Sequence, residues 1–131
     1  MLKISKLTDY ALVLLSEMKE EEVLSAQHLS QITRVPLATT NKLLKMLTSH
    51  GICQSKSGKM GGFSLAQAKE DISLLKIIHS IEGNNSKLTQ CTGGDQSCQL
   101  IGHCKITQKM NLIDKEISQV LSQKFLSDLS N

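Results

Sequence analysis

Hydrophobic residues in the first half of the chain recur at helical spacing, and short polar runs separate the groups. This spacing predicts a first helix over residues 3–18, followed by a polar turn at the acidic run 20–22. The expected buried stripe of this helix is Leu7, Ala11, Leu14, Leu15 and Met18. Ser25 is suited to cap a second helix, because its hydroxyl can accept hydrogen bonds from free backbone amides. The apolar face of the second helix would consist of Ala26, Leu29 and Ile32.

A third helix is predicted from Pro36 to about residue 49. Proline suits a first helical turn, where no amide donor is needed, and Gly51 is a natural stop. The residues expected to point inward are Leu37, Leu43, Leu44 and Leu47. Two short helices joined by a tight turn near residues 33–35, the second one basic, are typical of a helix-turn-helix.

The next segment, ICQSKSGKMGGFSLA, predicts two short strands over residues 52–55 and 63–65. They flank a tip rich in lysine and glycine. Its glycines permit positive φ angles and a close approach of the backbone to a ligand. A hairpin in this position, directly after a helix-turn-helix, indicates the wing of a winged helix.

The C-terminal half predicts two more helices. Ser73 is suited to cap the first, whose apolar positions are Leu74, Leu75, Ile78 and Ile81, and Gly83 follows its end. The second is long, and its apolar residues Ile106, Met110, Ile113, Ile117 and Val120 have the 4-3-4-3 spacing of a heptad seam. Such a seam can pair with its symmetry mate in a dimer or pack within the chain.

The expected fold class is mainly α. A winged helix-turn-helix DNA-binding domain would occupy residues 1–83, a cysteine loop 84–104, and a dimerisation helix with a tail 105–131. The 131 residues suit one domain or a compact domain with an appended element. No apolar run approaches the ~20 residues of a membrane helix, and the N-terminus lacks a signal-peptide cleavage site. We therefore expect a cytoplasmic protein with reduced thiols and no membrane partner.

Charge is distributed unevenly. The net charge is only +3, but residues 23–66 contain no Asp or Glu. The basic residues of that segment are Arg34, Lys42, Lys45, Lys56 and Lys59. A basic face confined to one segment is expected for contact with a phosphate backbone, and a merely solvated surface is the alternative. The chain has only three aromatic residues, which argues against binding of single-stranded nucleic acid by base stacking.

Seven side chains are candidates for contact with double-stranded DNA. They are Thr39, Thr40, Asn41, Lys42 and Lys45 in the third helix and Lys56 and Lys59 in the wing. Threonine and asparagine can contact base edges in the major groove, whereas lysine more readily binds phosphate.

Three cysteines lie in one short polar stretch, CTGGDQSCQLIGHC. Six residues separate Cys91 from Cys98, and five separate Cys98 from Cys104. This spacing favours a loop around an iron–sulfur cluster, since structural zinc sites more often have Cys-x-x-Cys knuckles. A two-iron cluster (2Fe-2S) is favoured and a four-iron cluster is the alternative. Zinc binding or contact with a partner protein are the other uses that we consider.

The remaining chemistry-bearing residues have simpler interpretations. Cys53 fits a small buried strand residue. No function is assigned to His28, His50 or His79. A thiol-redox or zinc enzyme is not expected, because the chain has no Cys-x-x-Cys and no plausible general base beside the cysteines.

These elements, in this order, resemble the Rrf-two family of bacterial winged-helix transcription regulators. The motifs that carry the resemblance are KISKLTDYALVLL, SAQHLSQIT, VPLATTNKLLKML, SGKMGGFSLA and ISLLKIIHSIEG, together with the cysteine loop. The similarity covers essentially the whole chain, and it is greatest to the regulators of iron–sulfur cluster assembly operons. It implies a homodimer that binds imperfect palindromes.

The resemblance also bears on the fourth cluster ligand. IscR-like members have a histidine three residues after the last cysteine, where this chain has Thr107. NsrR-like members use an aspartate near the start of the first helix of the other subunit, and Asp9 matches it. His103 and solvent are the alternatives, and Asp9 could instead serve to stabilise the positive end of its helix. The expected function is that of a repressor that senses cluster or redox status and controls cluster assembly genes.

Overall fold

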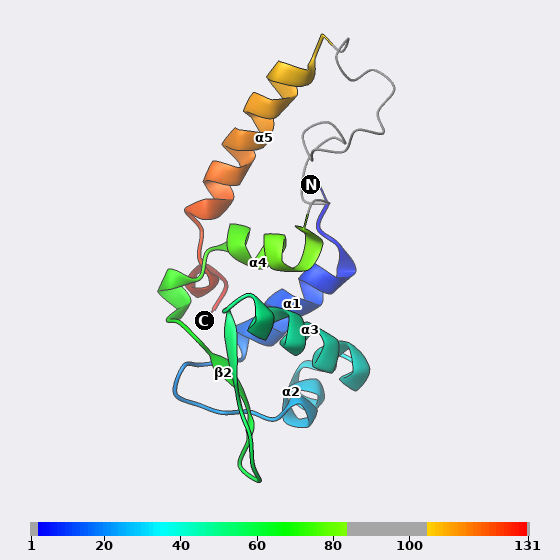
Figure 1. Cartoon of the computed structure of the whole chain (residues 1–131), viewed down its shortest axis with the longest axis vertical. Helices are drawn as coiled ribbons and strands as arrows, with labels where there is room; N and C mark the ends of the chain where they lie inside the picture. The colour runs from blue at the N-terminus through cyan, green and yellow to red at the C-terminus, as the bar shows by residue number, and fades with distance from the viewer. Residues whose placement is uncertain (1–2, 84–104, 131) are drawn as a thin grey trace.

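The computed structural model describes residues 3–83 and 105–130, in which a helix-turn-helix and a hairpin precede a long helix (Figure 1). The elements in chain order are α1 (Lys6–Ser16), α2 (Ala26–Thr33), α3 (Leu37–Ser49), β1 (Cys53–Lys56), β2 (Gly62–Leu65), the 3-10 helix η1 (Lys69–Asp71), α4 (Leu74–Glu82), α5 (Thr107–Ser122) and the 3-10 helix η3 (Leu126–Leu129). The predicted winged-helix architecture is confirmed. The three cysteines of the loop and His103 lie outside the described residues.

Serine hydroxyls cap three of the helices. The predicted caps are confirmed at Ser25, which accepts from the His28 amide at 3.0 Å, and at Ser73, which accepts from the Lys76 amide at 3.1 Å. Ser5 caps α1 in the same way, so this helix begins three residues later than predicted. Each cap satisfies a backbone amide that the helix itself leaves unpaired.

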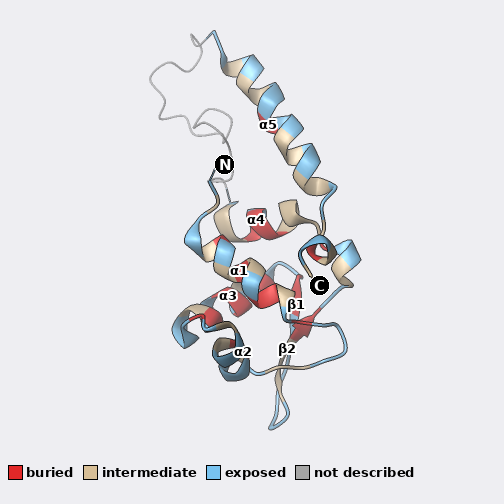
Figure 2. Cartoon of the chain, turned by 180° about the vertical axis from the view of Figure 1, so that it is seen from behind, coloured by how far each residue is buried: buried red, intermediate tan, exposed pale blue. Residues whose placement is uncertain are grey.

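The hydrophobic core lies where α1, α3, α4 and the base of the hairpin meet (Figure 2). The predicted stripe is confirmed for Ala11, Leu14, Leu15 and Met18, which are fully buried, whereas Leu7 is half-buried against the core and Met18 lies just after the end of α1. The expectation that Leu37 points inward is wrong, because its side chain is 45% exposed. Leu37 lies at the very start of α3, where neighbouring elements no longer cover the apolar face. Ile77 of α4 is fully buried although the spacing did not single it out.

β1 and β2 form a two-stranded antiparallel hairpin, with Cys53 opposite Leu65 and Lys56 opposite Gly62. An isolated bridge between Leu24 and Phe63 joins this hairpin to the segment before α2. Such a short hairpin has little stability of its own, so its position depends on this attachment.

The C-terminal tail returns to the body of the protein after α5. The Leu74 amide donates to the Lys124 carbonyl at 2.8 Å, and the Leu126 amide donates to the Ile72 carbonyl at 2.8 Å. The side chain of Leu126 is fully buried in the core. The residues after α5 are therefore part of the same core as the winged helix. In the described part of the chain, no helix has both the length and the apolar character needed to cross a bilayer.

This packing predicts a difference between two leucines of η3. Leu126→Ala should lower the free energy of unfolding by about 2–5 kcal/mol, because it leaves a cavity in the core. Leu129→Ala, at a position that is 47% exposed, should change the free energy of unfolding by no more than about 0.5 kcal/mol. Urea unfolding followed by circular dichroism measures both. Equal effects would contradict the placement of the tail in the core.

Candidate DNA interface and candidate metal centre

Hydrogen bonds around Val35 fix the turn of the helix-turn-helix. Its side chain is 3% exposed, and its carbonyl accepts from Ser30 Oγ at 2.6 Å and from Thr40 Oγ1 at 3.3 Å. Its amide donates to Thr33 Oγ1 at 3.3 Å. Arg34 adopts a left-handed conformation with φ of 64°, which reverses the chain between α2 and α3. The two helices are thus held at a defined angle.

The outer face of α3 carries most of the side chains that were expected to contact DNA. Asn41, Lys42 and Lys45 are exposed, and Thr39 is half-buried. The expectation that Thr40 contacts DNA is wrong, because its side chain is fully buried and its hydroxyl donates a hydrogen bond to the Val35 carbonyl. Thr40 therefore contributes to the α2–α3 turn and cannot reach a base.

The hairpin is held against the start of α2. The Leu24 amide donates to the Phe63 carbonyl at 2.9 Å, and the Phe63 amide donates to the Leu24 carbonyl at 2.8 Å. Gly62 approaches this segment so closely that a Cβ there would overlap the Leu24 carbonyl oxygen. Lys56 and Lys59 are both exposed on the hairpin. The wing and α3 therefore belong to one rigid frame.

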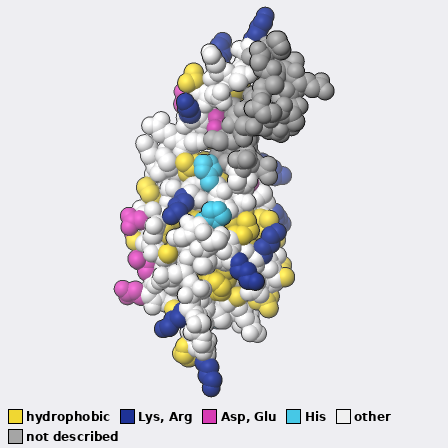
Figure 3. All heavy atoms as spheres, viewed as in Figure 1, with side chains coloured by type: hydrophobic (Ala, Val, Ile, Leu, Met, Phe, Trp, Pro, Cys, Tyr) yellow, Lys and Arg dark blue, Asp and Glu magenta, His cyan; other side chains and the backbone are white. Residues whose placement is uncertain are grey.

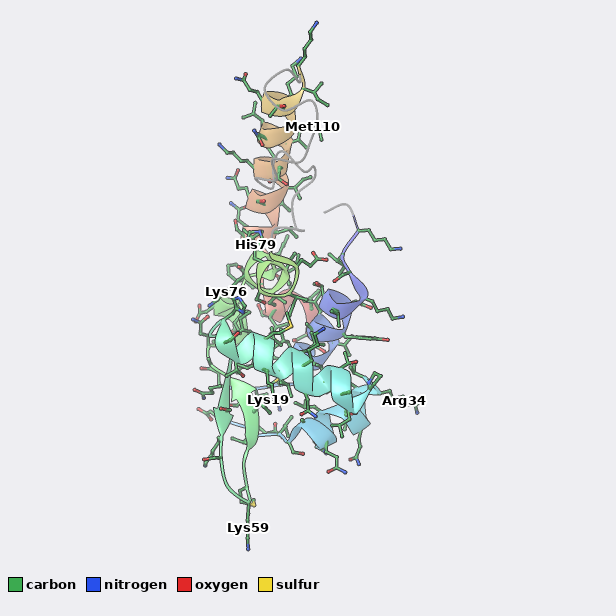
Figure 4. All side chains as sticks on the ribbon, turned by 45° about the vertical axis from the view of Figure 1, so that its right-hand side comes forward. Lys19, Arg34, Lys59, Lys76, His79 and Met110 are labelled. Carbon is green, nitrogen blue, oxygen red and sulfur yellow. The ribbon has the colours of Figure 1, made fainter. Side chains whose placement is uncertain are left out.

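Positive charge is concentrated on this frame. Among the described residues, none of the five basic side chains between residues 23 and 66 forms a salt bridge. Figure 4 places Arg34 at the start of α3 and Lys59 at the end of the wing, pointing away from the body. In Figure 3 the Asp and Glu side chains gather along one edge, and none lies over the wing. Unpaired cations on a rigid frame suit a phosphate backbone.

The start of α1 lies beside the end of α4. Asp9 is exposed in the first turn of α1, and it lines a hollow of about 540 Å³ together with Glu82. Glu82 Oε1 accepts a hydrogen bond from the Ser5 amide at 2.7 Å. Glu82 and Gly83 are the last described residues before the cysteine segment, so the described part of α4 ends beside this hollow. Sequence reasoning missed Glu82, because its partner is 77 positions away in the sequence.

Cys53, the fourth cysteine of the chain, is buried and therefore is not a candidate metal ligand. It is 2% exposed in β1, and burial raises the pKa of its thiol to about 12. The thiol is therefore protonated at neutral pH and unsuited to metal binding. Within residues 3–83 and 105–130, no three His, Cys, Asp or Glu side chains are grouped to hold a metal ion. Of the residues proposed as cluster ligands, Asp9 is the one that these ranges include.

α5 presents an apolar face that the described part of the chain leaves uncovered. Ile106, Ile113 and Val120 are 57%, 45% and 58% exposed, and all three belong to the heptad seam. Figure 1 shows that α5 extends away from the body. The interpretation of the seam as intrachain packing is not supported by these exposures.

Comparisons with known proteins agree with this geometry. The profile of the Rrf2 family, described as iron-dependent transcriptional regulators, matches residues 4–131. The chain belongs to the Rrf2 family. YwgB of Bacillus subtilis is 30% identical to this Rrf2 protein over 116 residues, which are 88% of this chain and 74% of YwgB. The transcriptional repressor NsrR of Streptomyces coelicolor is 23% identical and aligns with 98% of this chain and 88% of its own.

Solved structures show the same fold. CymR, the global cysteine regulator of B. subtilis, superimposes with a TM-score of 0.73 at 22% identity, covering 98% of this chain and 96% of CymR. IscR of T. potens gives a TM-score of 0.71 at 23% identity, covering 97% of this chain and 85% of IscR. The expectation of a DNA-binding transcriptional regulator rather than an enzyme is confirmed by membership of the Rrf2 family.

The basic frame predicts how DNA binding depends on salt. Affinity for a palindromic duplex selected from a random pool should fall steeply as salt rises, because phosphate contacts release counterions. Lys45→Ala and Lys59→Ala should each weaken binding to all sequences and reduce the log–log salt slope by about 1. Lys115→Ala, on the far side of α5 from its seam, is the matched control and should bind like the unaltered protein. Salt-independent binding would contradict this interface, and fluorescence anisotropy across a salt series measures it.

Proposed function

We propose that this Rrf2 regulator is a dimeric repressor that senses an iron–sulfur cluster and controls cluster assembly genes. The cluster would be held by Cys91, Cys98 and Cys104, with Asp9 as the fourth ligand. One structural observation supports this most directly: Glu82, one residue before the last described position ahead of the cysteine segment, lines the same hollow as the exposed Asp9. The description of the family as iron-dependent agrees with the proposal.

The chemistry of the donor set fits a cluster. Three thiolates bind iron strongly, and a carboxylate in the fourth position leaves one iron easier to release or attack. Asp9 lies in the first turn of α1, is exposed, and forms no salt bridge with any residue of the described ranges. A bound cluster, with two irons favoured over four, would supply a redox-active and labile group.

The chain also offers a path from the cysteine segment to the DNA-binding frame. Glu82 joins the end of α4 to the Ser5 amide at the start of α1, and Leu74 joins the start of α4 to Lys124 after α5. The segment 84–104 connects α4 to α5, so a change in it acts on both helices. If α5 pairs with α5 of a second copy through its apolar seam, the separation of the two recognition helices changes as well. A coupling of about 1–3 kcal/mol would alter DNA affinity about 5–150-fold.

A second candidate is an Rrf2 regulator without a cluster, whose cysteines bind zinc or contact a partner protein. The observation in its favour is the similarity of fold to CymR, which is named as a cysteine regulator. The metal content of the protein separates the two candidates.

The first prediction of this proposal concerns the cofactor. Anaerobically purified protein should contain iron and acid-labile sulfide, and Cys91→Ala, Cys98→Ala or Cys104→Ala should each remove both. Cys53→Ala is the matched control and should keep the cofactor, because the Cys53 thiol is buried and protonated. Metal analysis and visible absorption provide the measurement. Full occupancy by zinc without sulfide would establish the second candidate instead.

The second prediction concerns the fourth ligand. Asp9→Ala should shift the visible spectrum and speed cluster loss in air, because one iron loses its carboxylate ligand. Glu17→Ala removes an exposed carboxylate at the other end of α1 and should leave both unchanged. Thermal unfolding of both variants checks that the fold is intact. An unaltered spectrum and lifetime in Asp9→Ala would transfer the role to His103 or solvent.

Mixed dimers show whether Asp9 acts across subunits, as the family resemblance implies. Asp9→Ala chains are combined with chains that lack all three loop cysteines. With crossed ligation, each heterodimer has one site with both Asp9 and the three cysteines, and one site with neither Asp9 nor the cysteines. With ligation inside one chain, no complete site forms. A heterodimer cluster as labile as that of the Asp9→Ala homodimer would therefore rule out the crossed arrangement.

A further inference from the structure

We propose that Met60, at the tip of the wing, is an apolar wedge that enters the DNA minor groove and partly unstacks a base step. The inference rests on the DNA-binding role of α3 and the wing, and it adds a residue that reads the deformability of DNA. It does not depend on any metal, because it concerns the wing, which lies at the opposite end of the described structure from α5 (Figure 1).

The exposure of Met60 has no explanation within the protein. Its side chain is 85% exposed, whereas no other large hydrophobic side chain in the described ranges exceeds 60%. Ile113 and Val120 of α5, with Ile106 just before it, belong to a heptad seam that a second helix can cover, and Leu112, which is 60% exposed, lies on the same helix outside this seam. Met60 instead stands alone at a hairpin tip, between Lys59 and Gly61, and is not part of the hydrophobic core. A side chain in this position adds nothing to the core and is available to contact another molecule.

The wing holds this tip in a fixed position. The Gly61 amide donates to the Gly58 carbonyl at 3.0 Å, and Gly58 has a φ of 103°, which favours glycine. A Cβ at Gly61 would overlap the Lys56 carbonyl oxygen, so the turn allows no larger residue at position 61. At its base the hairpin is bound to Leu24, directly before α2. A tip fixed in this way has a defined position when α3 lies in the major groove.

The chemistry around Met60 favours DNA over a protein partner. Lys56 and Lys59 are both exposed on the same hairpin, and neither forms a salt bridge with any residue of the described ranges. Lysines on a narrow hairpin suit the phosphates that line a minor groove. Methionine is one of the side chains that minor-groove proteins insert between base pairs, and its unbranched thioether adapts to an irregular gap. Pyrimidine–purine steps open most easily, so the wedge should favour TA or CA steps under the wing.

The experiment compares Met60→Ala, Met60→Leu and Lys59→Ala on one selected palindromic duplex. Met60→Ala should weaken binding about tenfold, because the unstacked step is no longer filled. Its salt slope should equal that of the unaltered protein, since methionine releases no counterion, whereas Lys59→Ala should flatten the slope. Met60→Leu should retain most of the affinity. Because Met60 is exposed, all the Met60 variants should melt at the same temperature as the unaltered protein.

A second measurement detects the unstacking itself. 2-Aminopurine placed at the TA or CA step under the wing should brighten when the unaltered protein binds, and should not do so with Met60→Ala. Replacing that step by an A-tract should weaken the unaltered protein and leave Met60→Ala unaffected. Equal affinity and equal fluorescence for the two proteins would overturn the wedge and leave Met60 as a contact for a protein partner. If the unaltered protein binds no duplex in either cofactor state, the DNA-binding role fails instead.

Discussion

The buried turn at Val35 is the constraint on which the DNA-binding frame depends. Both polar groups of its backbone are satisfied by hydroxyls of neighbouring residues, Ser30, Thr33 and Thr40. A buried backbone group without a partner would destabilise the turn, so these hydroxyls hold α2 and α3 at one angle. That angle turns Asn41, Lys42 and Lys45 outward together. It also explains why Thr40 is absent from the outer face.

The second constraint is the attachment of the wing at Leu24. Leu24 precedes Ser25, the residue that caps α2, so the same short segment starts the helix-turn-helix and binds the hairpin. The close approach at Gly62 makes this attachment possible. Recognition helix and wing therefore move as one body. In the proposed DNA interface, the charge on α3, the charge on the wing and the exposed Met60 would therefore contact DNA as a single surface.

The helix that precedes the proposed sensor segment, α4, is joined to the rest of the fold at both of its ends. Glu82 is bound to the start of α1, and Leu74 is bound to the residue that follows α5. The cysteine segment connects α4 to α5, which makes it a suitable place for a labile group. We propose that a change there is transmitted through the hydrogen bonds of Glu82 and Leu74 and through the packed core. In the proposed dimer, the apolar seam of α5 would extend the same effect to a second copy of the chain.

The amino-acid sequence by itself determined the local features of this protein. Helix spacing, the serine caps at Ser25 and Ser73, the glycine-rich hairpin and the acid-free segment depend on neighbours a few residues apart. The structure agrees with them except at Ile32 and Leu37, which the spacing placed on apolar faces and which are 46% and 45% exposed. The cysteine spacing is also local, and it stays a prediction because it lies outside the described residues. Tertiary structure alone decided four features. They are the burial of Thr40, the exposure of Leu37, the core position of Leu126, and the placement of Asp9 and Glu82 around one hollow. Each of these depends on residues that are distant in sequence or on whether another element covers a helix end, and no periodicity along the chain encodes such contacts.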